Sequence, residues 1–429
     1  MFASRKYCRV LMLHRKRNDE ENVGGISLKW LEESITQFKQ KGFQFIDLDT
    51  FKECIDQRKP FPQNALLVTL DDGYADQVDE LVPIFLAQNI KPVVFLITDF
   101  IAKGALPWDE YIRILINSAN QSLTKFEHLG GNLHYILENE ADRSYARHDF
   151  IDRSELLNEE VVKHATSLLE TALHSANPKP SFTYSQPASI NSIQTMSQQG
   201  ASFANHTATH MIVASHSDEE CLQNLNRAKQ FISSHKLESE TFAYAIGKPH
   251  SIGNKEAVIS AAGFKYVFNA IEGIVHYKHA SPLSLNRIPY PESQEALKEI
   301  TSPIAPFKFS SSNPLIRAHD FLRLKFLMNY FGGKKAFIDW ALCKFSLIRG
   351  KYAEFELVRT NDVKRIVFFC MGNINRSAMA QTVFSNHSTL PVTSFGLKTQ
   401  PCFPPSVEAQ RWAKSQNIHI MDHKTTRLE

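Results

Sequence analysis

Two adjacent carboxylates, Asp71 and Asp72, end a run of apolar residues and are followed at once by Gly73. Residues 65–68 are typical of a buried strand, so both acids emerge at its carboxyl end, where parallel α/β folds bind their ligands. Successive strand residues point in opposite directions, which lets one acid bind a metal while the other serves as a general base. The plain alternative is a helix cap, in which an Asp binds free amides near Gly73 and does nothing more.

Two histidines far downstream can complete a metal site. His206 and His210 lie four positions apart in the stretch HTATH, and imidazoles at that spacing can converge on one divalent cation. With one carboxylate they make a His/His/Asp set that leaves coordination positions open for water and substrate. The chain has 17 histidines, so the spacing alone is weak. Its occurrence together with the Asp pair is what favours a metal centre.

Both stretches resemble motifs of one known family. Residues 69–75, TLDDGYA, and residues 205–210 are similar to the first two motifs of the polysaccharide deacetylases, the NodB homology or carbohydrate esterase family 4. Other segments resemble further motifs, in the order in which the family has them. With the family's motif in brackets, not this chain's own residues, they are residues 10–15 (LMYHR), 90–96 (ikaTFF), 105–111 (WWDE), 242–247 (FAYPYG) and 285–288 (lpRi). The resemblance covers roughly the first 290 residues. It implies an α/β fold, a deformed (β/α) barrel of the NodB deacetylase type.

The resemblance also implies roles for individual residues. Asp72, His206 and His210 would hold a divalent metal, expected to be zinc, and Asp71 would be the catalytic base. His14 becomes the general acid that protonates the leaving amine, although the residue by itself would be an ordinary histidine at a strand end. The implied substrate is an N-acetylated sugar or polysaccharide, and the implied products are acetate and a glucosamine-type sugar.

The third motif departs from the family pattern. Ala243 stands where the family commonly has an arginine that orients the catalytic carboxylate, so we expect Asp71 to be held less firmly. The backbone amide of Ile246 can still act as an oxyanion donor, because a backbone donor tolerates a changed side chain. Arg287 is expected to be an active-site strut or a surface salt-bridge partner. These departures leave an alternative open, a non-catalytic regulatory or scaffold protein with degenerate sites.

A second reactive group begins at Cys370, which with Arg376 forms a CxxxxxR loop. We predict a buried strand over residues 365–369 before this loop and a helix over residues 378–386 after it. In such a loop the backbone amides and the helix start bind phosphate, the arginine clamps it, and the positive field favours a nucleophilic thiolate. A buried structural cysteine is the alternative, but it would need neither Arg376 nor Ser377.

This loop resembles the signature CxGNICRS of the low-molecular-weight protein tyrosine phosphatases. By that resemblance Cys370 is the nucleophile, Arg376 the phosphate clamp and Ser377 a stabiliser of the thiolate. The other phosphate-binding residues would be Gly372, Asn373, Ile374 and Asn375, the last in place of a second cysteine of the family. Residues 392–396, residues 404–416 with Ile418, and residues 423–428 resemble the strand, helix and short segment that follow. The sequence ends roughly halfway through that fold, so we expect a truncated sequence or a phosphate-binding remnant and leave its phosphatase activity open.

The elements that must position these residues follow a β/α alternation. We predict strands at residues 7–13, 43–48 and 92–98 and helices at residues 27–41, 76–88, 190–199 and 217–233. We expect three parts in all. These are a deacetylase-like domain at residues 1–300 with a mostly helical insertion at about 105–185, a basic helical linker at 301–360, and a partial doubly wound phosphatase-like domain at 361–429. Residues 315–350 could contact an anionic membrane surface or pack on the first domain.

Composition limits the remaining possibilities. A chain of 429 residues with 43% apolar residues indicates two or more globular domains. Its net charge of +3 is too small to indicate nucleic-acid binding. We find no signal peptide and no run long enough to span a membrane, and the six cysteines are scattered, which favours a reducing compartment. We therefore expect a cytoplasmic protein. The two family resemblances, taken together, imply an enzyme of surface-polysaccharide metabolism whose second module responds to a phosphotyrosine protein.

Overall fold

The computed structural model describes most of the barrel-forming region and parts of the remainder. The described residues are 7–19, 23–119, 123–128, 131–135, 137–155, 157, 159–174, 184–302, 364–370, 376–387, 389–396, 404–406, 409–410, 413, 418–420 and 422–426. They fall into two compact units, the first drawn from Met1–Tyr111, Glu155–Glu159 and Ser181–Lys325, and the second from Ile112–Ser154, Glu160–Pro180 and Phe326–Glu429.

Seven parallel strands close into a barrel in the first unit. In order around the ring they are β1 (Tyr7–Leu13), β11 (Leu285–Pro289), β9 (Tyr266–Glu272), β8 (Thr241–Ala243), β7 (Ser202–Asn205), β4 (Val93–Leu96) and β3 (Ala65–Asp72). The ring closes because β3 pairs with β1 over six residue pairs, from Cys8–Ala65 to Leu13–Leu70. The short strands β2 (Gln44–Phe45) and β10 (Val275–His276) add to β3 and β1 respectively. The predicted (β/α) barrel is confirmed.

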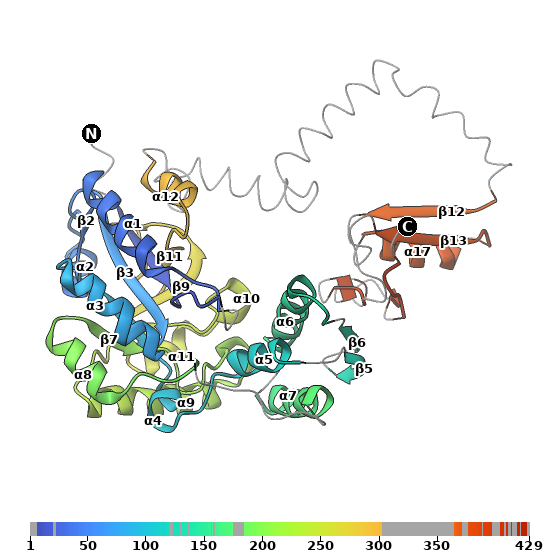
Figure 1. Ribbon diagram of the computed structural model, residues 1–429, viewed down its shortest axis with the longest axis horizontal. Helices are drawn as coiled ribbons and strands as arrows, with labels where there is room; N and C mark the ends of the chain where they lie inside the picture. Colours follow the sequence, from blue (N-terminus) through green and yellow to red (C-terminus); the bar gives the residue numbers. More distant parts are fainter. Residues whose placement is uncertain are drawn as a thin grey trace, which may run out of the picture. The chain divides into compact units, whose positions relative to one another are not determined.

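Helices surround these strands on the outside (Figure 1). They are α1 (Leu28–Gln40), α2 (Leu48–Asp56), the π-helix η1 (Gln77–Leu81), α3 (Val82–Ala87), α4 (Thr98–Lys103), α8 (Ile190–Gln198), the 3-10 helix η2 (Val213–Ser215), α9 (Asp218–Ser234), α10 (Pro249–Ile252), α11 (Glu256–Ala261) and α12 (Gln294–Thr301). Helix α5 (Trp108–Asn117) begins in this unit, and its larger part belongs to the second unit. Local chemistry sets several of their starts. Ser27 accepts a hydrogen bond from the Trp30 amide at the start of α1, and Ser217 with Glu220 forms a capping box on α9.

The alternation of β3 decides which side chains enter the barrel. Leu66, Val68 and Leu70 belong to the outer core cluster that also contains Phe38 of α1, whereas Ala65 and Leu67 belong to an inner cluster. A strand repeats every two residues, so the next positions of the inner face are Thr69 and Asp71. Asp71 therefore lies on the inner face, at the carboxyl end of a buried strand.

Two predicted elements differ from the structure. The strand expected at residues 43–48 is paired only at Gln44 and Phe45, because Asp47 caps α2 by accepting from the Thr50 amide at 3.0 Å. The single helix expected at residues 76–88 is divided into η1 and α3, since its first turns have the wider hydrogen bonding of a π-helix. Short π-helical segments of this kind often lie beside functional sites.

The insertion region of the second unit combines a hairpin with two helices. Strands β5 (Leu123–His128) and β6 (Gly131–Tyr135) pair antiparallel, and helices α6 (Glu140–Ser154) and α7 (Glu159–His174) follow. Helices were expected here, and the hairpin was not. Within α6, Arg153 donates to Asp149 at 2.8 Å and Asp149 also accepts from the Tyr135 hydroxyl at 2.8 Å.

The C-terminal segment contains two parallel strands and one helix. β12 (Ile366–Cys370) pairs in register with β13 (Val392–Gly396), and α17 (Arg376–His387) lies between them in sequence. The prediction that this first strand is buried is wrong, because Val367 and Phe369 are 37% and 56% exposed. A parallel sheet is normally covered on both faces, but within the described part of the chain Val367 and Phe369 remain exposed. The predicted linker beyond Ser302 and the proposed membrane-contacting residues 315–350 lie outside the described residues. Among the described helices none is long and apolar enough to cross a membrane.

Candidate active site

Asp71 is gripped by a buried arginine inside the barrel. Arg287 of β11 donates from Nη1 to Oδ1 of Asp71 at 2.6 Å and from Nη2 to Oδ2 at 2.7 Å. The same guanidinium donates to the Thr69 hydroxyl at 3.2 Å and from Nε to the Asn269 carbonyl at 2.8 Å. Arg287 is 1% exposed, so it is not a surface salt-bridge partner. Bidentate pairing of this kind fixes a carboxylate in both distance and plane.

The expectation that Asp71 would be loosely held is therefore wrong. The third motif lacks its arginine at Ala243, but Arg287 brings a guanidinium to the same carboxylate from a different strand. Burial is the largest single influence and would raise the pKa of Asp71, but the charge and hydrogen bonds of Arg287, together with the nearby His206 and His14, outweigh it and hold that pKa well below its usual value. The group is thus a carboxylate at neutral pH and can accept a proton.

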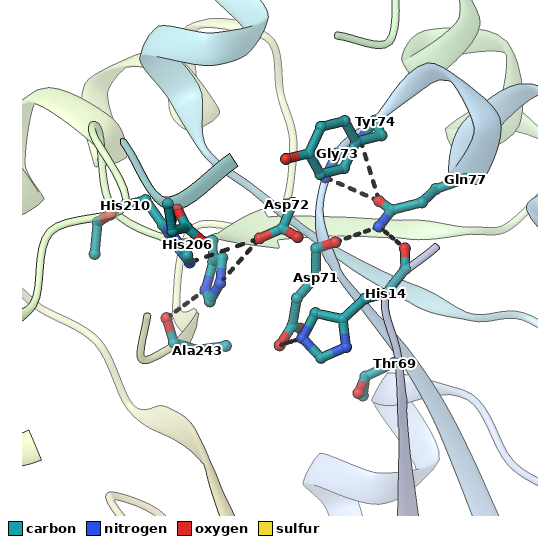
Figure 2. Close-up of polar contacts among 12 residues, drawn as sticks. His14, Thr69, Asp71, Asp72, Gly73, Tyr74, Gln77, His206, His210 and Ala243 are labelled. Carbon is teal, nitrogen blue, oxygen red and sulfur yellow. Dashed lines mark hydrogen bonds and ion pairs between the residues drawn. The ribbon is translucent and has the colours of Figure 1, made fainter. Parts of the chain in front are cut away.

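Asp72, His206 and His210 converge on the other side of the β3 end (Figure 2). One ligand atom from each lies within 4.8 Å of the other two. Oδ1 of Asp72 stands 3.6 Å from Nε2 of His206 and 3.7 Å from Nε2 of His210. That oxygen is buried and accepts no hydrogen bond among the described residues. An orphaned carboxylate oxygen facing two imidazole nitrogens fits a divalent cation, which would satisfy all three atoms.

The outer nitrogens of both histidines are already occupied. Nδ1 of His206 lies 2.8 Å from the Ala243 carbonyl oxygen, and Nδ1 of His210 lies 2.8 Å from Oδ1 of Asp109. Both partners only accept, so each Nδ1 carries a proton and each Nε2 is directed toward Asp72, where a cation would take up its lone pair in place of any proton. Metal-binding histidines are commonly oriented in this way by a carbonyl or a carboxylate.

Burial acts strongly on this group of three. It lowers the pKa of His206 to about 3, which leaves the imidazole neutral and able to coordinate. It also raises the pKa of Asp72 to about 6. Burial acts to lower the pKa of His210 as well, but the Asp109 carboxylate raises it to about 9. Asp109 therefore belongs to the candidate site through its contact with His210, and its only sequence signal was the resemblance to the WWDE segment.

Several site residues have a left-handed backbone. Asp72, Thr207, His210 and Ile246 have φ values of 92°, 67°, 57° and 61°, and none of them is glycine. That backbone conformation is unfavourable in free energy for residues other than glycine. It persists only where the surrounding structure enforces it, most often at functional sites. At Asp72 the turn directs the carboxylate away from the barrel interior and toward the histidines. No sequence signal apart from the neighbouring Gly73 foretells this turn.

The remaining predicted residues of the first site are placed as follows. His14 comes directly after β1, and its Nε2 lies 3.8 Å from Oδ2 of Asp71 with 49% of the side chain exposed. The amide of Ile246 makes no hydrogen bond to the described part of the chain. The helix-cap alternative for the acids does not apply, since the amides of Gly73 and Tyr74 bond instead to Oε1 of Gln77.

Comparison with known proteins identifies this region. Residues 155–267, which contain both histidines of the cluster, match the family model for polysaccharide deacetylase. The chain contains a polysaccharide deacetylase domain. The match indicates a hydrolase domain of the deacetylase class in this part of the chain. A search of the curated proteins found no match.

Solved structures similar to the chain include deacetylases and phosphatases. The Streptococcus pyogenes deacetylase PplD in complex with acetate is 15% identical, and the match covers 69% of this chain and 99% of the PplD chain with a TM-score of 0.45. IcaB from Ammonifex degensii is 14% identical over 69% of this chain and 96% of its own, with a TM-score of 0.44. The low-molecular-weight protein tyrosine phosphatase from T. tengcongensis is 32% identical over 16% of this chain and 50% of its own, with a TM-score of 0.15.

The second candidate site lies outside the deacetylase domain and is partly described. Sγ of Cys370, at the end of β12, is 2.9 Å from Oγ of Ser377, and Ser377 is 2% exposed. Arg376 is the first residue of α17 and is exposed. The four predicted loop residues, Gly372, Asn373, Ile374 and Asn375, lie outside the described residues. The structure thus brings the predicted nucleophile and its predicted stabiliser together.

Proposed function

We propose that this protein is a metal-dependent hydrolase that removes N-acetyl groups from an N-acetylated sugar or polysaccharide, with zinc as its divalent metal. The observation that carries the proposal is the adjacency of two different carboxylates at the end of β3. Asp71 is ionised and locked by Arg287, while Asp72 faces two histidine nitrogens with an unsatisfied oxygen. A helix cap or a structural ion pair would need only one of these arrangements.

Asp72, His206 and His210 would hold the cation, which supplies polarisation of the acetyl carbonyl oxygen and makes the attacking water more acidic. Asp71 takes the proton from that water. Its low pKa makes it a weak base at rest, but Arg287 fixes its orientation, and orientation accounts for a large part of such catalysis. Thr69 and Asn269 hold Arg287 in turn, so the base is supported by a fully bonded inner layer.

Proton return to the amine falls to His14. It is the half-exposed group of the site, so the sugar nitrogen can approach it from solvent while the acetyl carbon faces Asp71. As the C–N bond breaks, the imidazolium gives its proton to the departing amine and the acetate remains with the enzyme. The amide of Ile246 is a candidate donor to the oxyanion that develops on the acetyl oxygen.

Metal-dependent acetate release from short N-acetylglucosamine oligomers tests the proposal. The parent protein should release acetate when loaded with zinc, and the Asp71→Asn and His206→Ala variants should each lose at least about 100-fold in kcat. Metal content provides the second readout. We expect close to one ion per chain in the parent and in Asp71→Asn, and less in His206→Ala.

The alternative is a regulatory or scaffold protein with degenerate sites. No acetate release from the metal-loaded parent across several N-acetylated sugars, with no bound ion, would favour it. The deacetylase proposal is supported against it by Oδ1 of Asp72, a buried oxygen that accepts no hydrogen bond among the described residues and faces two imidazole nitrogens, an arrangement that a bound cation would satisfy.

A second function is supported by the contact between Cys370 and Ser377. We propose that the C-terminal segment binds phosphate as a tyrosine-phosphatase-like module, and that the chain works in the cytoplasm in surface-polysaccharide metabolism, with a phosphotyrosine protein as a partner. A hydroxyl 2.9 Å from Sγ can donate to a thiolate and stabilise it. Hydrolysis of an aryl phosphate by the parent, abolished in Cys370→Ser, would support the module's activity. Vanadate binding without turnover would indicate a phosphate-binding remnant.

A further inference from the structure

The side chain of Gln77 bonds to four backbone groups of the deacetylase site (Figure 2). Nε2 donates to the carbonyl oxygens of His14 and Asp71, and Oε1 accepts from the amides of Gly73 at 2.9 Å and Tyr74 at 3.2 Å. The side chain is fully buried. A primary amide has two N–H donors and an oxygen with two lone pairs, and all of them are used here.

The side chain of Gln77 connects β1 and β3 just beyond the end of their backbone pairing. The ladder between β1 and β3 finishes at the Leu13–Leu70 pair. The next residue on each strand is His14 and Asp71, the two groups proposed to move protons. Their carbonyls meet on the same amide nitrogen of Gln77, which joins the strands one step beyond their last backbone pair.

The acceptor half of the same side chain stabilises the turn that aims Asp72. Asp72 and Gly73 have φ values of 92° and 88°, an unfavourable pair for a chain to adopt unaided. Oε1 of Gln77 accepts hydrogen bonds from the amides of Gly73 and Tyr74. These two amides follow the last backbone pair between β1 and β3, and the glutamine gives them the partner that the strand pairing no longer supplies.

The neighbouring residue secures the same loop. Asp76 accepts from the Lys16 amide at 2.8 Å and from Nε of Arg15 at 3.1 Å. The start of the π-helix therefore holds the segment after β1 by two consecutive side chains, and only one of them, Gln77, also reaches β3.

We propose that Gln77 is the positioning residue that sets the place of His14 relative to Asp71 and Asp72. It acts through these residues and does not touch substrate. The inference rests on the proposed function, because it requires His14 and Asp71 to serve one reaction.

Two substitutions separate the halves of the amide. Gln77→Glu keeps an acceptor for Gly73 and Tyr74 but puts a carboxylate oxygen against the carbonyls of His14 and Asp71. Gln77→Met removes all four bonds at a similar size and introduces no charge. Amide hydrogen exchange at Gly73 and Tyr74 should stay slow in Gln77→Glu and accelerate in Gln77→Met, and a cooperative thermal unfolding transition is the check that each variant folds.

The decisive experiment combines Gln77→Glu with His14→Ala. Alone, Gln77→Glu should lower kcat on the order of 10- to 100-fold, with KM changed by less than about twofold. In the His14→Ala background it should lower kcat by less than about twofold, because the residue it positions is gone. An equal loss in both backgrounds, or no loss in either, would overturn the proposal.

A crystal structure of Gln77→Glu decides the question if the parent proves inactive. The distance from Nε2 of His14 to Oδ2 of Asp71, 3.8 Å in the parent, should grow by about 1 Å or more. An unchanged distance would refute the positioning role. An inactive parent with a displaced His14 would instead refute the proposed function and leave the positioning role standing.

Discussion

Arg287 and Asp71 lie 216 positions apart in the chain and form a bidentate pair at 2.6 and 2.7 Å in the barrel interior. The pair joins β11 to β3 across β1, which lies between them in the ring. Neither charge reaches solvent to any extent, with side chains 1% and 3% exposed. Removing one partner would therefore leave the other as an uncompensated buried charge.

Arg287→Met should cost about 3–5 kcal/mol of unfolding free energy and at least about 100-fold in kcat, because Asp71 loses its partner and its orientation. Arg287→Lys should restore part of the stability but little of the activity, since an ammonium cannot pair with both oxygens at once. Denaturant unfolding and acetate release measure the two effects. The double variant Asp71→Asn/Arg287→Met is the matched control, which should regain stability without activity. A double variant no more stable than Arg287→Met would contradict this account.

Asp109→Ala should weaken zinc binding by about 10- to 100-fold, because the variant no longer orients the His210 ring. Asp109→Asn keeps an oxygen that accepts from Nδ1, so its loss should be smaller. Competition with a chromogenic chelator measures the affinity without any need for turnover. Asp218→Ala is the control, since that carboxylate is 74% exposed and pairs with Lys255. Equal affinities for Asp109→Ala and Asp218→Ala would show that the contact has no part in metal binding.

Most strands and helices of the barrel were predictable because they depend on short-range patterns. The choice of Asp72 as the partner of the two histidines came from the family resemblance, since it lies on a distant strand. The period of two in β3 and the spacing of His206 and His210 are local properties. The replacement of one arginine by another was not predictable in this way. Arg287 can reach Asp71 only because the barrel closes, and no local rule relates two strands 216 residues apart. The role of Gln77 was not predicted for a different reason. Its four partners are backbone groups, which every residue type has, so no residue pattern in the sequence indicates the contacts.

Iodoacetamide should alkylate Cys370 before Cys8, Cys54 or Cys221 in the native protein. Cys370 is partly exposed, whereas the other three are buried and burial raises the pKa of each of their thiols. Because each pKa unit changes the thiolate fraction tenfold, we expect a rate difference of at least about 10-fold near pH 7. Peptide mass spectrometry over a time course measures it. The difference should vanish in guanidinium, and its absence in the native protein would contradict the placement of Cys370 at the end of β12.

Gly73→Ala should destabilise the deacetylase domain by more than Gly42→Ala. Both glycines have a positive φ, 88° and 77°, so the left-handed backbone costs either alanine variant about 1–2 kcal/mol of unfolding free energy. A Cβ at Gly42 would meet nothing within 4 Å, but at Gly73 it would stand 2.7 Å from Cδ2 of Leu96 and 3.1 Å from Cδ1 of Ile101. The buried Leu96 must shift, at a further cost of about 1–3 kcal/mol. Denaturant unfolding of the two variants isolates this packing contribution, because the backbone cost is common to both. Equal destabilisation would mean that the turn after Asp72 has room to relax, and it would remove crowding as the reason for glycine there.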